Sequence, residues 1–161
     1  MSPYRPDLVD VWIFRVDPAD GLEILLLRRA PGRILAGLWQ GVSGGLEGDE
    51  RIVDGALREL REETGIVPAD LEAVYDLDQV NQFHVASIDA VLSAAVFAAR
   101  VRPGATARLS HEHDRQEWVG ADEAIRRSVW PAYRESVARI RDHLLDPAVA
   151  AWFEIQVGTG E

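Results

Sequence analysis

The sequence predicts an α/β fold in which a mixed β-sheet carries helices on both faces. The chain has 161 residues, a length that fits one domain. Its composition is that of a globular protein, because 47% of the residues are hydrophobic and 27% are charged. Strand-like segments come first, then a helix, more strands and a closing helix, an order typical of a sheet covered by helices. We expect a single domain over residues 1–161, with a core from about 8 to 146 and a C-terminal extension over 147–161.

The first two predicted strands flank a turn. Leu8–Val16 is rich in Val, Ile, Trp and Phe, and Leu22–Leu27 is almost wholly aliphatic. Asp17–Gly21 between them consists largely of turn-forming residues, which predicts a hairpin. Ala30–Gly37 contains Pro-Gly and indicates a loop, and a short strand over Leu38–Val42 follows.

A glycine-rich loop over Ser43–Asp49 leads into a predicted helix over Glu50–Thr64. Apolar residues recur along this helix at spacings of three and four, which places them on one face. Gly65 is the expected residue just beyond the helix end, because glycine accepts the left-handed backbone found there.

The remainder of the chain alternates between strand and helix patterns. Further strands are expected over Leu71–Asp78, over Val85–Val101 with a break near 87–89, and over Glu117–Val119. Helices are expected over Ala121–Arg127 and Pro131–Leu145, and the second starts with a proline, which suits a first helical turn. The apolar residues of the tail from Ala148 fit either an extra strand or a contact with a partner.

Composition excludes several classes of function. Arg and Lys number 17 against 27 Asp and Glu, so the net charge is −10, which argues against binding nucleic acid or an anionic membrane by bulk charge. The chain has no Cys, which excludes disulfides, thiolate zinc sites, iron–sulfur clusters and a Cys nucleophile. We expect a cytoplasmic protein, since no signal peptide or membrane-spanning run is present. All 17 basic residues are Arg, so phosphate contacts must come from guanidinium groups.

Three glutamates cluster on the predicted central helix. Glu59 and Glu63 are four residues apart and Glu62 is three residues after Glu59, so all three are neighbours on one surface. Like charges so placed repel one another and require a counter-charge, either from Arg58 or Arg61 or from a divalent cation. Clustered carboxylate oxygens suit Mg²⁺, with Mn²⁺ as a substitute. Taken alone, such a cluster also fits a solvated helix face.

The segment Gly44–Ile66 forms a single motif. Its defining residues, in order and with five, seven, one and one residues between the groups, are Gly44, Glu50, Arg58-Glu59-Leu60, Glu62-Glu63 and Gly65-Ile66. This spacing resembles the Nudix box at every defining position. The resemblance to the Nudix hydrolase family implies an α/β/α sandwich with a loop–helix–loop catalytic motif. It also implies an Mg²⁺-dependent enzyme that hydrolyses a nucleoside diphosphate linked to a group X.

The resemblance also implies roles for the residues of the box. The implied metal ligands are Glu59, Glu62, Glu63 and the carbonyl of Gly44. One helix carboxylate would act as general base, with Glu59 the first choice and Glu63 the second. Arg58 and Glu50 would orient that base; alternatively, they form a buried ion pair that braces the loop against the helix.

Residues outside the box resemble the dihydroneopterin triphosphate pyrophosphatase branch of the family. They are Trp39–Gly44 before the helix, and Glu112–Asp114 followed by Trp118. In that branch a Glu six residues before a Trp supplies a further metal ligand, and Glu112 keeps this spacing. Glu112 is therefore the expected ligand from outside the helix, with a solvated loop acid as the alternative.

Substrate contacts are expected before the box. Arg28 and Arg29 follow a predicted strand where the branch places a phosphate-binding arginine, and Arg29 is the preferred candidate over a surface ion pair. Trp39 fits either stacking on a base or pterin ring or a place in the core. The long loop over 30–37 and the tail beyond Asp146 depart from the branch and leave the substrate open.

The leading interpretation is an Mg²⁺-dependent pyrophosphohydrolase of a nucleoside or pterin triphosphate. A dinucleoside polyphosphate or nucleotide-sugar hydrolase stays open, as does a catalytically silent Nudix-fold sensor that binds a nucleotide. We expect a small phosphorylated molecule as the partner, and neither nucleic acid nor membrane. The apolar tail favours a homodimer.

Overall fold

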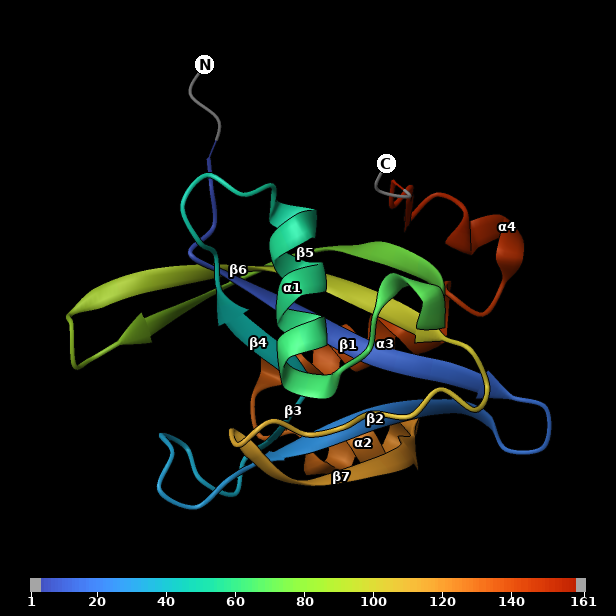
Figure 1. Ribbon diagram of the computed structural model, residues 1–161, viewed down its shortest axis with the longest axis horizontal. Helices are drawn as coiled ribbons and strands as arrows, with labels where there is room; N and C mark the ends of the chain where they lie inside the picture. The colour runs from blue at the N-terminus through green and yellow to red at the C-terminus, as the bar shows by residue number, and fades with distance from the viewer. Residues whose placement is uncertain (1–3, 159–161) are drawn as a thin grey trace.

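A computed structural model describes residues 4–158 (Figure 1). Over these residues the chain forms one mixed β-sheet of eight strands with helices on both faces. The strands are β1 (Leu8–Asp17), β2 (Gly21–Arg29), β3 (Trp39–Gln40), β4 (Val42–Gly45), β5 (Leu71–Val85), β6 (Ala90–Val101), β7 (His113–Gly120) and β8 (Glu154–Ile155). The helices are α1 (Ile52–Thr64), α2 (Ala121–Arg127), α3 (Pro131–His143), α4 (Pro147–Ala150) and a 3-10 helix at Pro68–Asp70. The predicted α/β class is confirmed.

Strand β1 lies at the centre of the sheet and makes the sheet mixed. It pairs antiparallel with β2 and β4 and parallel with β6. Its side chains from Val9 to Phe14 are all buried, because it has neighbouring strands on both edges and helices over both faces. Asp10 interrupts this otherwise apolar run and is only 6% exposed.

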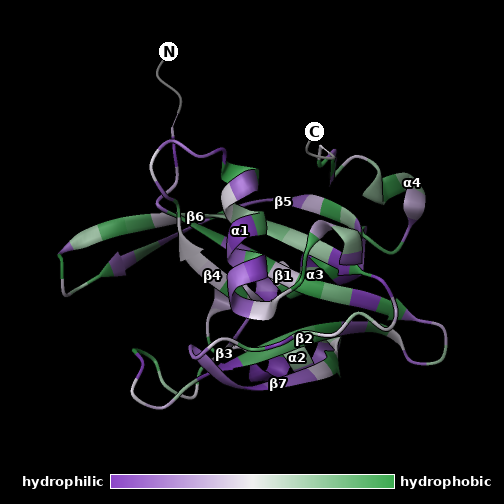
Figure 2. Cartoon of the chain, viewed as in Figure 1, coloured by the Kyte–Doolittle hydropathy of each residue, from purple (hydrophilic) through white to green (hydrophobic). Residues whose placement is uncertain are grey.

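Alternating side chains of the strands build two apolar cores. On one face, Val9 packs in a cluster with Leu60 of α1. On the other face, Trp12 and Phe14 pack in a second cluster with Ile140 of α3. In Figure 1 α1 lies in front of the sheet and α2 and α3 lie behind it, and Figure 2 shows hydrophobic residues along the strands between them. The result is the α/β/α sandwich expected from the motif.

Helix α1 begins two residues later than the predicted start at Glu50. The side chain of Glu50 accepts a hydrogen bond from the backbone N–H of Glu47 at 2.7 Å and so closes the turn before the helix. The predicted end of the helix is correct. Gly65 has a φ of 72°, and its N–H donates to the carbonyl of Arg61 at 2.8 Å, as expected for a left-handed C-terminal residue.

The predicted single strand over Leu38–Val42 is wrong, because the structure has two short strands there. β3 pairs with β2 and β4 pairs with β1, so the chain changes partner at Gly41. A Cβ on Gly41 would lie 2.8 Å from the carbonyl oxygen of Val11, which explains a glycine at this crossing. β4 also takes in the first residues of the predicted loop over Ser43–Asp49.

Strand β5 continues past the predicted end at Asp78 as far as Val85. A bulge after Asp76 interrupts its pairing with β6, and Asp78 adopts a φ of 52° there. The predicted break near 87–89 is the turn between the two strands, and β6 begins at Ala90 rather than at Val85. In Figure 1 the far ends of β5 and β6 project from the body as a two-stranded ribbon.

The C-terminal third follows the predictions more closely. α2 spans the predicted residues, and α3 starts at the predicted proline and ends at His143 instead of Leu145. β7 is longer than predicted and begins at His113 instead of Glu117, because it pairs with β2 as far as Arg29.

The tail forms the extra strand that was one of its two expected roles. The carboxylate of Asp146 accepts a hydrogen bond from the N–H of Ala148 at 2.9 Å and caps α4. β8 then pairs with the outer edge of β5, with Ile155 opposite Val74. The contact with a partner stays a prediction, and Trp152 in this tail is 89% exposed. Between residues 4 and 158, every helix is too short or too polar to cross a membrane.

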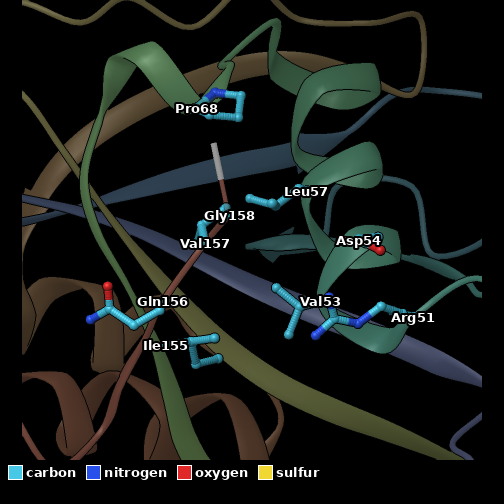
Figure 3. Close-up of a pocket in the computed structure, with 9 residues that line it drawn as sticks. All are labelled: Arg51, Val53, Asp54, Leu57, Pro68, Ile155, Gln156, Val157 and Gly158. Atoms are coloured by element: carbon cyan, nitrogen blue, oxygen red, sulfur yellow. The ribbon is translucent and has the colours of Figure 1, made fainter. Parts of the chain in front are cut away.

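The tail and α1 enclose a cavity of about 300 Å³ (Figure 3). Val53 and Leu57 of α1 line it together with Ile155 and Val157 of the tail. The cavity lies along the first half of the helix, and none of the predicted site residues lines it.

Candidate functional site

The second half of α1 carries the predicted glutamates, and the structure brings two of them into the interior. Glu59 is 9% exposed and Glu63 only 2% exposed, because their positions lie on the face of the helix that packs toward the sheet. The side chain of Glu62 is 51% exposed and lies at the edge of the cluster. The cluster is therefore not a solvated helix face.

The backbone of Gly44 lies against the carboxyl group of Glu59. A Cβ on Gly44 would stand 2.1 Å from the carboxyl carbon of Glu59, whereas a Cβ on the next residue, Gly45, would meet nothing within 4 Å. Pairing of β4 with β1 fixes this approach, since Gly44 is opposite Val9. A side chain at residue 44 would displace the carboxylate.

Arg58 is the counter-charge of the cluster. Its guanidinium donates to Glu50 and to Glu59 at 2.7 Å each and to Glu62 at 3.2 Å. It also donates to the carbonyl of Gly45 at 2.8 Å, so it ties the loop to the helix. The expected ion pair between Arg58 and Glu50 is therefore present, and this pair also contacts the candidate base Glu59.

This ion pair controls the charge of Glu50. Hydrogen bonds from Arg58 and from the backbone N–H of Glu47 lower the pKa of Glu50 to about 2. The same pairing raises the pKa of the Arg58 guanidinium. Both groups are therefore fully charged across the physiological range of pH.

Glu63 is the most deeply buried acid of the cluster. Its Oε2 atom has no hydrogen-bond partner among residues 4–158. Burial, together with the negative charges of Glu112 and Glu59, raises the pKa of Glu63 to about 9. Burial also raises the pKa of Glu59, against the opposing effect of Arg58. A buried acid of this kind is unusual without a functional reason.

Glu112 reaches the cluster from outside the helix, as predicted. It precedes β7, and its side chain lies within hydrogen-bond reach of the Glu63 carboxyl. Its charge also raises the pKa of Glu59. The structure therefore brings together three carboxyl groups from two segments that are distant in the sequence.

His113 belongs to the same cluster, and the only sign of this in the sequence is its position next to Glu112. It is buried, and its Nε2 accepts a hydrogen bond from the amide of Gln40 at 3.0 Å. The proton is then on Nδ1, which lies 4.0 Å from Oε2 of Glu63. Burial and the positive charge of Arg29 lower the pKa of His113 to about 4, so the ring is neutral.

These residues fit a divalent cation of the hard, oxygen-binding kind. They offer carboxylate oxygens and a backbone carbonyl at Gly44, and the buried Oε2 of Glu63 lacks any other partner in the described chain. Within residues 4–158, no three Asp, Glu or His side chains lie in a geometry that could hold a metal ion. Glu59 and Glu62 pair with Arg58 instead. A cation must therefore compete with Arg58 for them.

The two arginines before the site differ in their surroundings. Arg28 donates two hydrogen bonds to Asp114, at 2.9 and 2.8 Å, and so forms a surface ion pair. Arg29 donates through Nε to the carbonyl of Ile34 at 3.2 Å, and its charge acts on the buried His113. Of the two arginines, Arg29 is therefore the one whose charge acts on the carboxylate cluster.

Trp39 is half-buried and packs against the core under α2 and α3. The guanidinium groups of Arg28 and Arg127 lie 5.9 and 5.2 Å from the centre of its ring. This environment fits the core role of Trp39 better than stacking on a substrate ring.

Comparison with known proteins decides the family. The model of the NUDIX domain matches residues 6–140, which include the glycine loop, α1 and Glu112. The chain belongs to the NUDIX domain family. The expected membership of the Nudix family is thereby confirmed.

Solved Nudix structures share the fold. An Ap4A hydrolase from C. elegans, in a binary complex, has a TM-score of 0.71 at 20% identity and covers 92% of this chain and 100% of its own. The dihydroneopterin triphosphate pyrophosphohydrolase of E. coli has a TM-score of 0.70 at 22% identity, over 84% and 94%. The NUDIX domain of Shewanella oneidensis NrtR, complexed with ADP ribose, has a TM-score of 0.68 at 17% identity, over 88% and 89%. At these identities the similarity shows the Nudix fold alone.

A curated relative is more similar in sequence. The octanoyltransferase of Myxococcus xanthus is 39% identical over 120 residues, which are 73% of this chain. This chain spans about a third of the length of that relative, since the match covers 32% of it.

Proposed function

We propose that this Nudix hydrolase is an Mg²⁺-dependent pyrophosphohydrolase that cleaves a nucleoside or pterin triphosphate, with Mn²⁺ as a substitute cation. The observation that carries the proposal is the carboxyl cluster of the buried Glu59 and Glu63 with the half-buried Glu112, which has an unpartnered oxygen on Glu63. An acidic protein can bind a polyphosphate only where local positive charge offsets its own.

The metal ligands in this proposal are Glu59, Glu62, Glu63, Glu112 and the carbonyl of Gly44. A bound divalent cation supplies positive charge that stabilises the charge developing on the phosphate oxygens. The close contact between the backbone of Gly44 and the Glu59 carboxyl supports this ligand set, because it places the two residues next to each other in the site.

Glu59 is the proposed general base, with Glu63 as the second candidate. Glu59 is buried, which raises its pKa toward the range where a carboxylate accepts a proton effectively. Arg58 donates to Glu59 and is itself held by Glu50, so these two residues position the base rather than contact substrate.

Arg29 is the proposed phosphate-binding residue. It is the last residue of β2, and its guanidinium lies close enough to the cluster to lower the pKa of His113. Arg28 is a weaker candidate because its guanidinium already donates two hydrogen bonds to Asp114.

A screen of phosphorylated compounds with Mg²⁺ tests the proposal. Nucleoside triphosphates, dihydroneopterin triphosphate, dinucleoside polyphosphates and nucleotide sugars are incubated with wild type and with Glu63→Gln, and released pyrophosphate and phosphate are measured. We expect a triphosphate to release pyrophosphate, and Glu63→Gln to be slower by about a hundredfold or more. Cleavage confined to a dinucleoside polyphosphate or a nucleotide sugar would overturn the triphosphate as the substrate and assign that compound class instead. Wild-type protein that binds a nucleotide without cleaving any compound would favour the sensor.

The variant has a matched control on the same helix. Asp54→Asn changes an exposed acid that lies away from the cluster, and it should retain wild-type turnover. Equal turnover in Glu63→Gln and Asp54→Asn would remove Glu63 from the metal site.

A further inference from the structure

A second buried acid, Asp10, lies on the opposite face of the sheet from α1. It is the residue of β1 opposite Ser43 of β4, and it is 6% exposed. The hydroxyl of Ser43 and the side-chain amide of Asn81 both face its carboxyl group. None of the roles proposed above for the Nudix box uses this acid.

Hydrogen bonds from α3 fix the orientation of Asn81. The amide nitrogen of Gln79 donates to the carbonyl of Ala132 at 3.1 Å and to Oδ1 of Asn81 at 2.8 Å. The carbonyl of Ala132 can only accept a hydrogen bond, so the amide of Gln79 cannot be turned over, and its oxygen lies 3.0 Å from the hydroxyl of Ser136. The Nδ2 group of Asn81 is therefore the part that faces Asp10.

Two buried hydrogen-bond donors in this region make no hydrogen bond within residues 4–158. Nδ2 of Asn81 and Nε1 of Trp12 are buried, and neither has a hydrogen-bond partner of ordinary geometry among the described residues. Trp12 is 1% exposed, lies two residues after Asp10 on the same face of β1, and packs edge-on against Tyr133 at 5.2 Å. Buried polar groups in native proteins are nearly always paired, so two such donors beside a buried acid point to a missing ligand.

Ser43 joins this region to the carboxylate cluster. Its hydroxyl faces Asp10, while its backbone N–H faces the carboxyl group of Glu63. A molecule whose phosphates lie against Glu63 and Gly44 therefore has its next group near Asp10. Ser43, Asn81 and Tyr133 are each only half-buried, so they form a border between Asp10 and solvent.

We infer that Asp10, Asn81 and Trp12 recognise the heterocyclic ring of the substrate, and that this ring is of the 2-amino-oxo type found in guanine and pterins. Asp10 accepts hydrogen bonds from the ring N–H and the amino group. Asn81 or Trp12 donates to the neighbouring ring carbonyl. This inference rests on the proposed function, because it names the substrate class of the same site.

The chemistry of the three groups selects this ring over the others. A carboxylate offers two acceptors side by side, which match the adjacent N–H and amino donors of guanine and pterin. The corresponding edge of adenine places an unprotonated ring nitrogen beside its amino group, and that nitrogen would face the carboxylate with a lone pair. Burial raises the pKa of Asp10 to about 6, so at neutral pH the group is still mainly an acceptor.

Binding of nucleoside monophosphates tests the inference without depending on turnover. Calorimetric titration compares guanosine, inosine and adenosine 5′-monophosphates, with neopterin as a second probe of the ring. We expect guanosine monophosphate or neopterin to bind about tenfold or more tightly than adenosine and inosine monophosphates, since inosine lacks the amino group. Asp10→Asn should abolish this preference, and the exposed Asp142→Asn should keep it.

A second variant guards against a folding defect in Asp10→Asn. Asn81→Ala changes a half-buried residue and should weaken the preference by about fivefold or more, with circular dichroism confirming the fold of both variants. Equal affinity for all probes, or a preference that survives in Asp10→Asn, overturns the inference. A preference that depends on Asp10 in a protein that hydrolyses no compound would overturn the proposed activity and leave the ring site standing.

Discussion

The backbone of Gly44 and the carboxyl group of Glu59 are in direct contact, although one lies in β4 and the other in the middle of α1. The contact leaves no space for a methyl group, which would stand 2.1 Å from the carboxyl carbon. The first glycine of the Nudix box is therefore required by the position of its central glutamate, and not by an unusual φ angle of the glycine itself.

Gly44→Ala should lower turnover by about tenfold to a hundredfold while the protein stays folded. The added methyl group displaces the end of a flexible side chain, so Glu59 moves and the fold does not. Steady-state kinetics and thermal unfolding check the two parts of this prediction. Gly45→Ala is the control, because a Cβ there meets nothing within 4 Å, and equal activity of the two variants would contradict the prediction.

Stability without divalent cations should fall as pH rises. The pKa of Glu63 is about 9 in the fold, above its ordinary value of 4.5, so folding favours the protonated form. The resulting contribution to the free energy of unfolding is complete below about pH 4.5 and is lost as pH rises toward 9. Thermal unfolding in EDTA between pH 5 and 9 should show a steeper loss for wild type than for Glu63→Gln. Parallel curves would show that Glu63 is not protonated in the fold.

Arg58→Met should destabilise the protein and increase its response to Mg²⁺. Removing the guanidinium leaves Glu50, Glu59 and Glu62 without their shared counter-charge, and we expect the unfolding temperature to fall by about 5 °C or more. Saturating Mg²⁺ should raise the unfolding temperature further in the variant than in wild type, since the cation no longer competes with Arg58. Arg61→Met, an exposed change on the same helix, should behave as wild type in both measurements.

Glu112→Ala should raise the Mg²⁺ concentration needed for half-maximal activity by about tenfold or more. The residue contributes a carboxylate next to Glu63 from outside the helix, so its loss weakens the cation site without removing it. A metal titration of activity measures the effect, with the exposed Asp122→Ala as the control. An unchanged titration curve would place Glu112 outside the site.

Arg29→Ala should raise KM for the triphosphate about tenfold, and Arg28→Ala should change it by about twofold at most. Arg28 is held by two hydrogen bonds to Asp114, whereas Arg29 acts on the buried cluster. Initial rates over a range of substrate concentrations distinguish the two arginines, and the reverse order of effects would assign the phosphate to Arg28.

Local pattern predicted the parts of the fold that depend on local interactions. The end of α1 at Gly65 and the clustering of Glu59 with Glu63 follow from helical spacing, which the neighbouring residues alone define. The extension of β5 to Val85 could not be predicted in the same way, because it depends on pairing with β6 across a turn and around a bulge.

The same limit applies to the site. The resemblance to the branch, carried by the spacing of Glu112 to Trp118, predicts Glu112 near the site, but the burial of His113 against Glu63 depends on where β7 pairs with β2. The partners of Asp10 could not be predicted from its own strand, since Ser43 and Asn81 come from β4 and β5. Contacts between side chains that depend on the register of a sheet cannot be predicted from the sequence of one segment.

The pairing of β8 with β5 has a consequence for biosynthesis. β5 leaves the ribosome long before β8 is translated, so the outer edge of β5 near Val74 has to wait for its neighbour. During that interval the nascent chain presents free amide and carbonyl groups along this edge, the kind of edge that chaperones shield and that can pair with the same strand of a neighbouring nascent chain.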